Sequence, residues 1–339
     1  MTRIRAISAG LLLLFITLIS PGSLMSQTEP TLFFGLALDG YPVTAARLDR
    51  LKTQSGISPA VVVFFLQWPE NPGDFHFPAQ SFDAIDKSNA VPCLTWEPMY
   101  ISNGKEQAIP ADEILRGRYD SFIRDFARKA RMSGKLLLLR FAHEMNISRY
   151  HWGTTETDYG PDSPGLYISM FKHVAGIFQA EKAENVKFIF CPNSESIPHP
   201  IWSTNGKWNT GSAWYPGNNY VDILGIDGYN WGTTQTKKKH GWDSRFRSFR
   251  EIMEPMYKEL KEIAPDKPII VFETSCTDRG GDKEKWIRDT VRISEAWNIK
   301  GLVWFEADKE VDWRLNTGID SSTIRFLRNN TSDKFNPGN

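Results

Sequence analysis

Short apolar stretches alternate with longer amphipathic stretches along most of the chain. An apolar run of about five to eight residues indicates a buried strand, whereas apolar residues spaced three and four apart indicate a helix. The sequence predicts strands at residues 32–38, 60–66, 91–96, 136–141, 186–191, 221–226, 268–272 and 301–305. It predicts helices at residues 43–54, 80–88, 112–132, 166–182, 246–263, 283–297 and 322–328.

Strands that alternate with helices predict a parallel sheet. Eight such units in a chain of 339 residues match a single (β/α)₈ barrel, the TIM-barrel architecture, with its site at the C-terminal ends of the strands. A doubly wound open sheet is the alternative. That fold is expected to carry a Gly-rich phosphate-binding loop after an early strand, and none is seen. The connection at residues 194–219 is polar, aromatic and rich in Gly and Pro, which indicates a long functional loop.

The N-terminus has the pattern of a secretory signal peptide. Arg3 and Arg5 precede an apolar run at residues 6–19, and small residues follow it. We therefore predict a signal peptide at residues 1–26 and the barrel at residues 27–339. The run is shorter than the roughly 18 to 20 residues that a membrane-spanning helix needs, so an uncleaved anchor is the weaker alternative. We expect a secreted or periplasmic protein with no stable membrane insertion after signal removal.

Composition narrows the possible partners. Lys and Arg together number 40, as do Asp and Glu, so no excess of positive charge favours nucleic acid. The three cysteines, Cys93, Cys191 and Cys276, are too few and too widely spaced for a disulfide framework or a zinc site. His143 lacks the second His of a helical zinc motif, because Ile147 stands four residues on. We expect no metal, no cofactor and a monomer.

Two predicted strands end in acidic side chains. Four Leu at residues 136–139 lead to His143 and Glu144, and the apolar run at residues 268–272 leads to Glu273. In a barrel, the C-terminal ends of the fourth and seventh strands face one cleft. Hydrolysis of an acetal needs one carboxylic acid to protonate the leaving oxygen and one carboxylate to attack the anomeric carbon. Glu144 and Glu273 are therefore the predicted catalytic pair.

Aromatic residues gather at the same ends of the strands. Tryptophan is frequent, with 12 in the chain, and such rings serve either as core residues or as platforms for a sugar. Trp152, Tyr229 and Trp304 are the candidate substrate-binding rings. Tyr229 either donates a hydrogen bond to Glu273 or packs in the barrel mouth, and Trp304 either forms the floor of the site or is a core residue. His143 is either structural or in contact with the sugar.

Several segments of the sequence, which include both predicted catalytic acids, resemble glycoside hydrolase family 26, whose best-known members are β-mannanases. The matching segments, in the family's order, are residues 95–98, 140–146, 191–193, 214–217, 220–222, 227–229, 272–275, 303–305 and 312–314. The resemblance implies a (β/α)₈ barrel and a retaining double displacement. It implies that Glu144 is the acid/base, that Glu273 is the nucleophile, and that His143, Tyr229 and Trp304 line the reacting subsite.

The resemblance has one departure. Mannan-degrading members often follow the His-Glu-Met-Asn motif with Gly and then a Trp, whereas this chain has Ile147, Ser148 and Arg149, and aromatic residues resume at Tyr150 and Trp152. The expected function is a secreted endo-β-glycanase acting on β-1,4-mannan-type polysaccharide. The alternatives are a β-1,3-1,4-glucanase or β-1,3-xylanase of the same family, an enzyme that trims the cell's own exopolysaccharide, and a non-catalytic carbohydrate-binding barrel.

Overall fold

The barrel is closed by parallel strand pairing all the way round. The computed structural model describes residues 31–337, so the predicted signal peptide at residues 1–26 lies outside the described residues. The strands follow the order β1-β10-β9-β8-β7-β6-β3-β2. Their bounds are β1 Phe33–Leu38, β2 Val61–Gln67, β3 Val91–Glu97, β6 Leu137–Phe141, β7 Val186–Phe190, β8 Ile223–Asn230, β9 Ile269–Cys276 and β10 Gly301–Glu306. This closure confirms the predicted (β/α)₈ barrel and excludes the open sheet.

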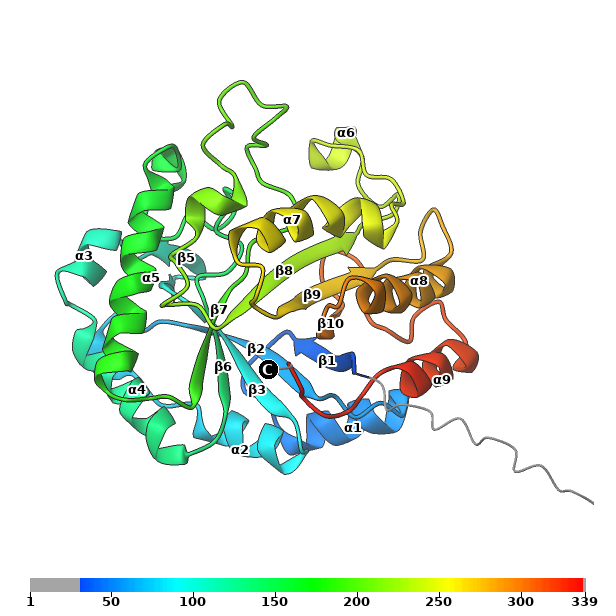
Figure 1. Ribbon diagram of the computed structural model, residues 1–339, viewed down its shortest axis with the longest axis horizontal. Coiled ribbons are helices and arrows are strands. Elements are labelled where there is room, and N and C mark those ends of the chain that lie inside the picture. Colours follow the sequence, from blue (N-terminus) through cyan, green and yellow to red (C-terminus); the bar gives the residue numbers. More distant parts are fainter. Residues whose placement is uncertain (1–30, 338–339) are drawn as a thin grey trace, which may run out of the picture.

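Helices surround the barrel, as Figure 1 shows. The longer ones are α1 Ala45–Ser55, α2 Ala79–Lys87, α4 Asp120–Ser133, α5 Ser163–Ala180, α7 Phe249–Ile263, α8 Lys283–Ala296 and α9 Ser321–Asn330. The shorter ones are α3 Ala111–Leu115, α6 Lys237–His240, η1 Pro72–Asp74, η2 Glu156–Asp158 and η3 Gly211–Trp214. Within residues 31–337, no helix combines the length and apolar character needed to cross a membrane.

Two local features differ from the sequence prediction. The helix predicted at residues 112–132 is divided into α3 and α4. An antiparallel hairpin of β4 Met99–Ser102 and β5 Lys105–Ala108 follows β3, where no strands were expected. β4 is only four residues long and β5 is mostly polar, so neither gives the apolar signal of a buried strand, which explains the omission. The hairpin lies after the C-terminal end of β3.

The barrel interior is a packed core. Along each strand, side chains alternate between two apolar clusters. The outer cluster includes residues of the surrounding helices, and the inner cluster includes none. In β1, for example, Phe33 and Ala37 belong to the inner cluster and Leu36 to the outer one. Leu138 of β6 is also inner, and Arg140 shares its side of the strand while being completely buried. A charged side chain therefore lies within the barrel.

Side-chain caps fix the starts of some of the helices. Thr44 accepts a hydrogen bond from the backbone N–H of Arg47 at the start of α1, and Ser248 forms a reciprocal capping box with Glu251 at the start of α7. Each such cap stabilises its helix by about 1 kcal/mol. The capping box of α7 lies directly after the long loop that follows β8, so it fixes where this loop ends.

We predict that Gly301→Ala destabilises the barrel. A Cβ on Gly301 would lie 2.1 Å from the ring of Phe33 on the neighbouring strand. Overpacking of this kind costs about 1 to 3 kcal/mol. The matched control is Gly176→Ala in α5, where a Cβ meets nothing within 4 Å and the helix gains about 0.5 to 1 kcal/mol. Denaturant unfolding measures both, and equal effects of the two substitutions would contradict this packing.

Candidate active site

Glu144 and Glu273 lie in one buried cluster of charge. Glu273 is on β9, and Glu144 follows β6, the fourth strand of the barrel along the chain. Their exposed fractions are 7 % and 5 %. Burial and then the charge of Glu273 raise the pKa of Glu144, so the two carboxyl groups are close enough to interact. The structure thus brings together the two acids that the sequence paired.

The backbone before Glu144 is held in an unusual conformation. Ala142 and Glu144 have φ angles of 48° and 49°, in the left-handed region that non-glycine residues rarely adopt. The N–H of Ala142 donates to the carbonyl of Trp96 at 3.1 Å, and that of Glu144 donates to the carbonyl of Cys191 at 2.8 Å. Bonds to the neighbouring strands on both sides therefore impose this geometry, which commonly marks a functional site.

Arg140 donates hydrogen bonds to several members of this cluster of charge. Its Nη1 donates to Asp227 Oδ2 at 2.6 Å, and its Nη2 donates to Glu273 Oε1. Its Nε and Nη2 also donate to Thr95 Oγ1, at 2.9 and 2.7 Å. A fully buried guanidinium needs such partners, because an unpaired buried charge is strongly unfavourable. Arg140 thus compensates both acids and fixes the direction of the Glu273 carboxylate.

Glu144 is the acid whose proton is held near neutral pH. Burial and the charge of Glu273 raise its pKa to about 7. Asn193 Nδ2 opposes this shift by donating to Glu144 Oε1 at 2.7 Å, which favours the charged form. Glu273 has a different environment, because it accepts hydrogen bonds from Arg140 and Tyr229, and both donors favour a carboxylate. The two acids therefore have different hydrogen-bonding environments.

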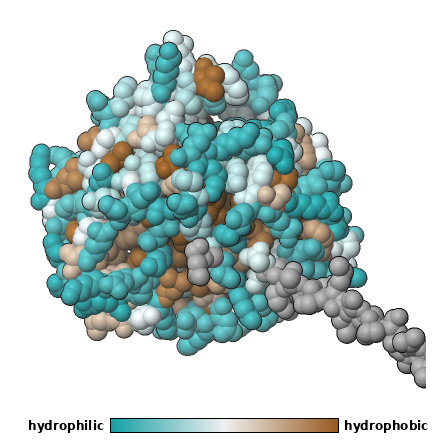
Figure 2. Space-filling view, in the orientation of Figure 1, coloured by the Kyte–Doolittle hydropathy of each residue, from teal (hydrophilic) through white to brown (hydrophobic). Residues whose placement is uncertain are grey.

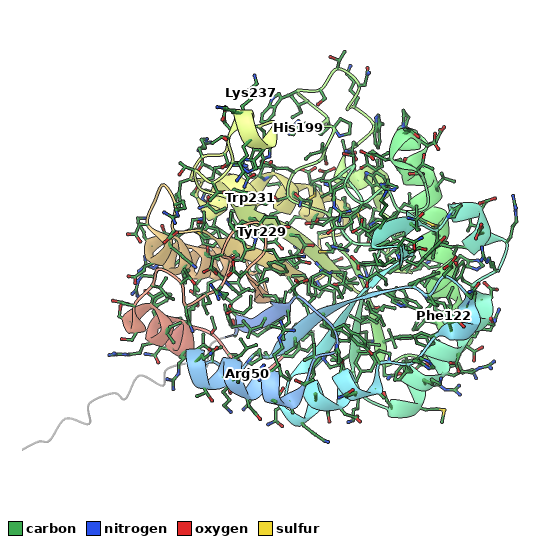
Figure 3. The ribbon with its side chains drawn as sticks, turned by 180° about the vertical axis from the view of Figure 1, so that it is seen from behind. Arg50, Phe122, His199, Tyr229, Trp231 and Lys237 are labelled. Atoms are coloured by element: carbon green, nitrogen blue, oxygen red, sulfur yellow. The ribbon has the colours of Figure 1, made fainter. Side chains whose placement is uncertain are left out.

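Tyr229 contacts the second acid directly. Its hydroxyl donates to Glu273 Oε2, and its ring lies 5.1 Å from Trp313 and 5.7 Å from Phe305. Burial and the charge of Glu273 hold its pKa well above the ordinary value, so the phenol keeps its proton. Both sequence alternatives for Tyr229 are therefore observed, the hydrogen bond and the packing at the barrel mouth. Figure 3 shows Tyr229 beside Trp231 on this part of the chain.

His143 is a buried, neutral imidazole. Burial and the charge of Arg140 hold its pKa well below the ordinary value. Its ring lies 4.7 Å from Tyr150 and 6.0 Å from Phe65. Its Nδ1 has no hydrogen-bond partner among residues 31–337. Within the same residues, no group of three or more His, Cys, Asp or Glu side chains is placed to hold a metal ion.

Trp152 supports the site from behind another ring. It stacks on Tyr150 at 5.1 Å with an interplanar angle of 8°, and its indole N–H donates to the His143 carbonyl at 2.6 Å. Tyr150 also packs against the His143 ring at 4.7 Å, and burial and then the charges of Glu144 and Glu97 hold its pKa well above the ordinary value. Tyr150 is thus an aromatic member of this buried cluster that was not among the predicted substrate-binding residues.

The expected place of Trp304 in the substrate site is wrong. Val303 and Phe305 belong to the inner cluster of the barrel, whereas Trp304 belongs to the outer one and packs against Trp286 of α8 at 6.2 Å. Its indole N–H donates to the Trp313 carbonyl at 2.8 Å. The alternation of strand side chains points Trp304 away from the cleft, so it is a core residue.

Arg149, which departs from the family pattern after His143 and Glu144, is held in place at the rim of the site. Its two Nη atoms donate to the two carboxylate oxygens of Glu106 at 2.6 and 2.7 Å, and its guanidinium lies 4.8 Å from the Tyr150 ring centre. Glu106 belongs to the hairpin that sequence reasoning missed. Arg149 and the hairpin therefore border the site next to Tyr150.

Comparison with known proteins gives a consistent result. The model of glycosyl hydrolase family 26 matches residues 114–252. Endoglucanase H of Acetivibrio thermocellus is 32% identical over 263 residues, which are 77% of this chain and 26% of that protein. A mannan endo-1,4-beta-mannosidase of Bacillus subtilis is 24% identical over 240 residues, 61% of this chain and 60% of that one. The chain thus spans about a quarter of the first relative and three fifths of the second.

Solved structures agree on the fold. A Bacillus subtilis mannanase superposes with a TM-score of 0.62 at 17% sequence identity, covering 90% of this chain and 87% of that chain. A β-mannanase of the same family from Bacteroides ovatus gives a TM-score of 0.60 at 18% identity and covers 90% of each chain. At such identities the likeness supports the barrel architecture.

Glu97, a further buried acid, yields a prediction for stability. Burial raises its pKa to about 7, although Gln67 donates a hydrogen bond that lowers it. The folded state therefore holds this proton more tightly than the unfolded state, so the stability it gives is present below pH 4.5 and lost as the pH rises through 7. We expect Glu97→Gln to gain up to about 2 kcal/mol relative to wild type between pH 5 and pH 8.

Urea unfolding at both pH values measures this difference. The control is Glu195→Gln, because Glu195 follows β7 with an exposed carboxylate paired to Arg247. The control difference should not depend on pH in this way. A pH-independent effect of Glu97→Gln would show that this carboxyl does not titrate near neutrality.

Proposed function

Because this chain belongs to glycoside hydrolase family 26, we propose that it is a retaining endo-β-glycanase that cleaves β-1,4-mannan-type polysaccharide. The family identifies it as a glycoside hydrolase. The observation that carries the mechanism is the pair of buried acids in unlike environments: Glu144 with its pKa raised to about 7, and Glu273 held by Arg140 and Tyr229. One acid that can give a proton and a second carboxyl group fixed for attack are what a double displacement requires.

In the first step, Glu273 attacks the anomeric carbon and the glycosidic bond breaks. The leaving oxygen takes the proton of Glu144, so the departing sugar is a neutral alcohol. Arg140 and the Tyr229 hydroxyl hold the attacking carboxylate in a fixed direction. The product of this step is a glycosyl ester of Glu273.

In the second step, Glu144 acts as a base. It is now ionised, and it removes a proton from a water molecule that attacks the same carbon. The ester bond breaks, Glu273 is released as a carboxylate, and Glu144 regains its proton. Two displacements at one carbon retain its configuration. The hydrogen bond from Asn193 supports Glu144 while it carries charge.

The relatives support more than one substrate class. The Bacillus subtilis relative is a mannan endo-1,4-beta-mannosidase, which supports mannan. The first relative is named an endoglucanase, which supports β-1,3-1,4-glucan as the second candidate. Arg149 paired to Glu106 at the rim also separates this site from the family's usual mannan pattern. We further propose secretion or a periplasmic location, on the basis of the signal-peptide pattern at residues 1–26.

We predict that Glu144→Gln and Glu273→Ala each lower kcat by about 10³-fold or more, because each removes a group that takes part in bond exchange. The measurement is reducing-sugar release from the best substrate among galactomannan, glucomannan, barley β-glucan and β-1,3-xylan. The two variants should differ on an aryl glycoside with a good leaving group. There Glu144→Gln retains a rapid first step, because no protonation is needed, whereas Glu273→Ala does not.

Glu195→Gln, at another strand end, is the matched control and should keep wild-type activity. Activity within a few-fold of wild type in either Glu144→Gln or Glu273→Ala would contradict the proposal. A first product of inverted anomeric configuration would contradict the retaining route.

The alkaline limb of kcat/KM should lie near pH 7. Glu144 must be protonated for the first step, so activity falls as the pH rises through its pKa of about 7. Asn193→Ala removes a hydrogen bond that favours the carboxylate, so this limb should move to higher pH. A pH–rate profile of both proteins tests this prediction, and a limb that stays in place or moves to lower pH in the variant would argue against Glu144 as the acid.

A further inference from the structure

A long loop after β7 carries a second set of aromatic rings. Figure 1 shows this loop projecting from the barrel between β7 and β8, and Figure 2 shows an apolar patch on the projecting part of the surface. Trp202 and Ile201 are 82 % and 79 % exposed. Large apolar side chains exposed together are unfavourable in water, so they commonly mark a binding surface.

The exposed ring is held in place. Trp202 stacks on His199 at 4.2 Å with an interplanar angle of 8°. His199 Nδ1 accepts the backbone N–H groups of Ile201 and Trp202 at 3.1 and 3.4 Å, which fixes the imidazole under the indole. Gly206 packs so closely on the His199 carbonyl that a Cβ would lie 2.1 Å from it. Trp202 is thus a flat, preordered surface with one face free for a ligand.

A cavity of about 530 Å³ opens on the same loop. Its walls include Tyr159, Pro198, Lys207 and Trp208. The Tyr159 and Trp208 rings lie 5.3 Å apart at 68°, and both rest on the buried Trp214 at 5.9 and 6.1 Å. Aromatic walls with a few polar groups at this volume suit a small ligand or part of a chain rather than a protein surface.

The loop is tied to the catalytic strand end through Asn146. The Asn146 carbonyl accepts the N–H of Ile197 at 2.8 Å and the side-chain amide of Asn209, also at 2.8 Å. The Asn146 side chain in turn accepts the N–H of Asn193, which holds Glu144. Both ends of the projecting segment are therefore anchored two residues after Glu144.

We propose that this loop is a second saccharide-binding site, formed by the Trp202 face and the Tyr159–Trp208 cavity, which holds the polysaccharide outside the cleft while Glu144 and Glu273 cleave it. The inference rests on the proposed function. Sugar rings present flat C–H faces to indoles and hydroxyls to polar groups, and Trp202, Lys207 and Asn205 supply both kinds of partner. The site adds affinity for long chains and does not take part in the chemistry.

The test is affinity electrophoresis in gels that contain soluble galactomannan, glucomannan or β-glucan. Trp202→Ala and Trp208→Ala should weaken retention by about tenfold, the effect of losing one ring contact. Trp202 is exposed, so its substitution leaves the fold intact even if loss of Trp208 disturbs packing. Met132→Ala, which removes an equally exposed apolar side chain from α4, is the control and should bind as wild type.

Kinetics separate this site from the catalytic one. Trp202→Ala should raise KM for the polysaccharide and leave kcat/KM for the shortest cleaved oligosaccharide unchanged within about twofold. Wild-type retention in Trp202→Ala, no retention of wild type on any polysaccharide, or equal losses on long and short substrates would each overturn the inference. So would a change of oligomeric state in Trp202→Ala, since that outcome assigns the surface to a protein contact.

The two proposals fail separately. Retention that depends on Trp202 in a protein that cleaves none of the glycans would leave this site standing and reject the proposed hydrolysis. If the protein cleaves a glycan and Trp202→Ala is retained as strongly as wild type, the proposed hydrolysis stands and this second site is rejected.

Discussion

The buried guanidinium of Arg140 is the constraint on which the site depends. It lies inside the barrel with no solvent contact, and it donates to Asp227, Glu273 and Thr95, which come from three other strands. Such a charge is tolerated only while its partners stay in place, because a buried ion without its counter-ion is strongly unfavourable. Closure of the barrel and the direction of the Glu273 carboxylate are therefore linked through one side chain.

This arrangement also separates the two acids. Glu273 is supplied with donors, whereas Glu144 receives a single amide hydrogen bond and the repulsion of its neighbour. The two acids also stand on different backbone, since β6 is followed by two left-handed residues, whereas β9 continues to Cys276 with a register shift beside Glu273 against both β8 and β10. The strained strand end thus places Glu144 where burial and the charge of Glu273 raise its pKa.

Much of this could be predicted from the sequence, and the failures have physical reasons. All eight barrel strands follow from apolar runs, yet β8 and β9 continue to Asn230 and Cys276, beyond the apolar residues. Backbone pairing persists where polar side chains begin, so an apolar criterion ends a strand where the site starts. Trp304 was predicted to line the substrate site. It lies between Val303 and Phe305, whose side chains belong to the inner cluster, so strand alternation already points its own side chain outward.

Other site residues gave weaker signals. Arg140 is a charged residue in an apolar strand, on the same side as Leu138, and that pattern alone indicates a buried partner. Tyr150 and Asn193 lie in loops after β6 and β7, where no periodicity constrains their direction, so only the folded chain brings Asn193 to Glu144 and Tyr150 to His143. A site whose acids stand on strands and whose supporting groups stand on loops keeps its chemistry fixed while the loops vary. The hairpin that carries Glu106 and the loop that carries Trp202 are the two places where this chain has room to set what it binds.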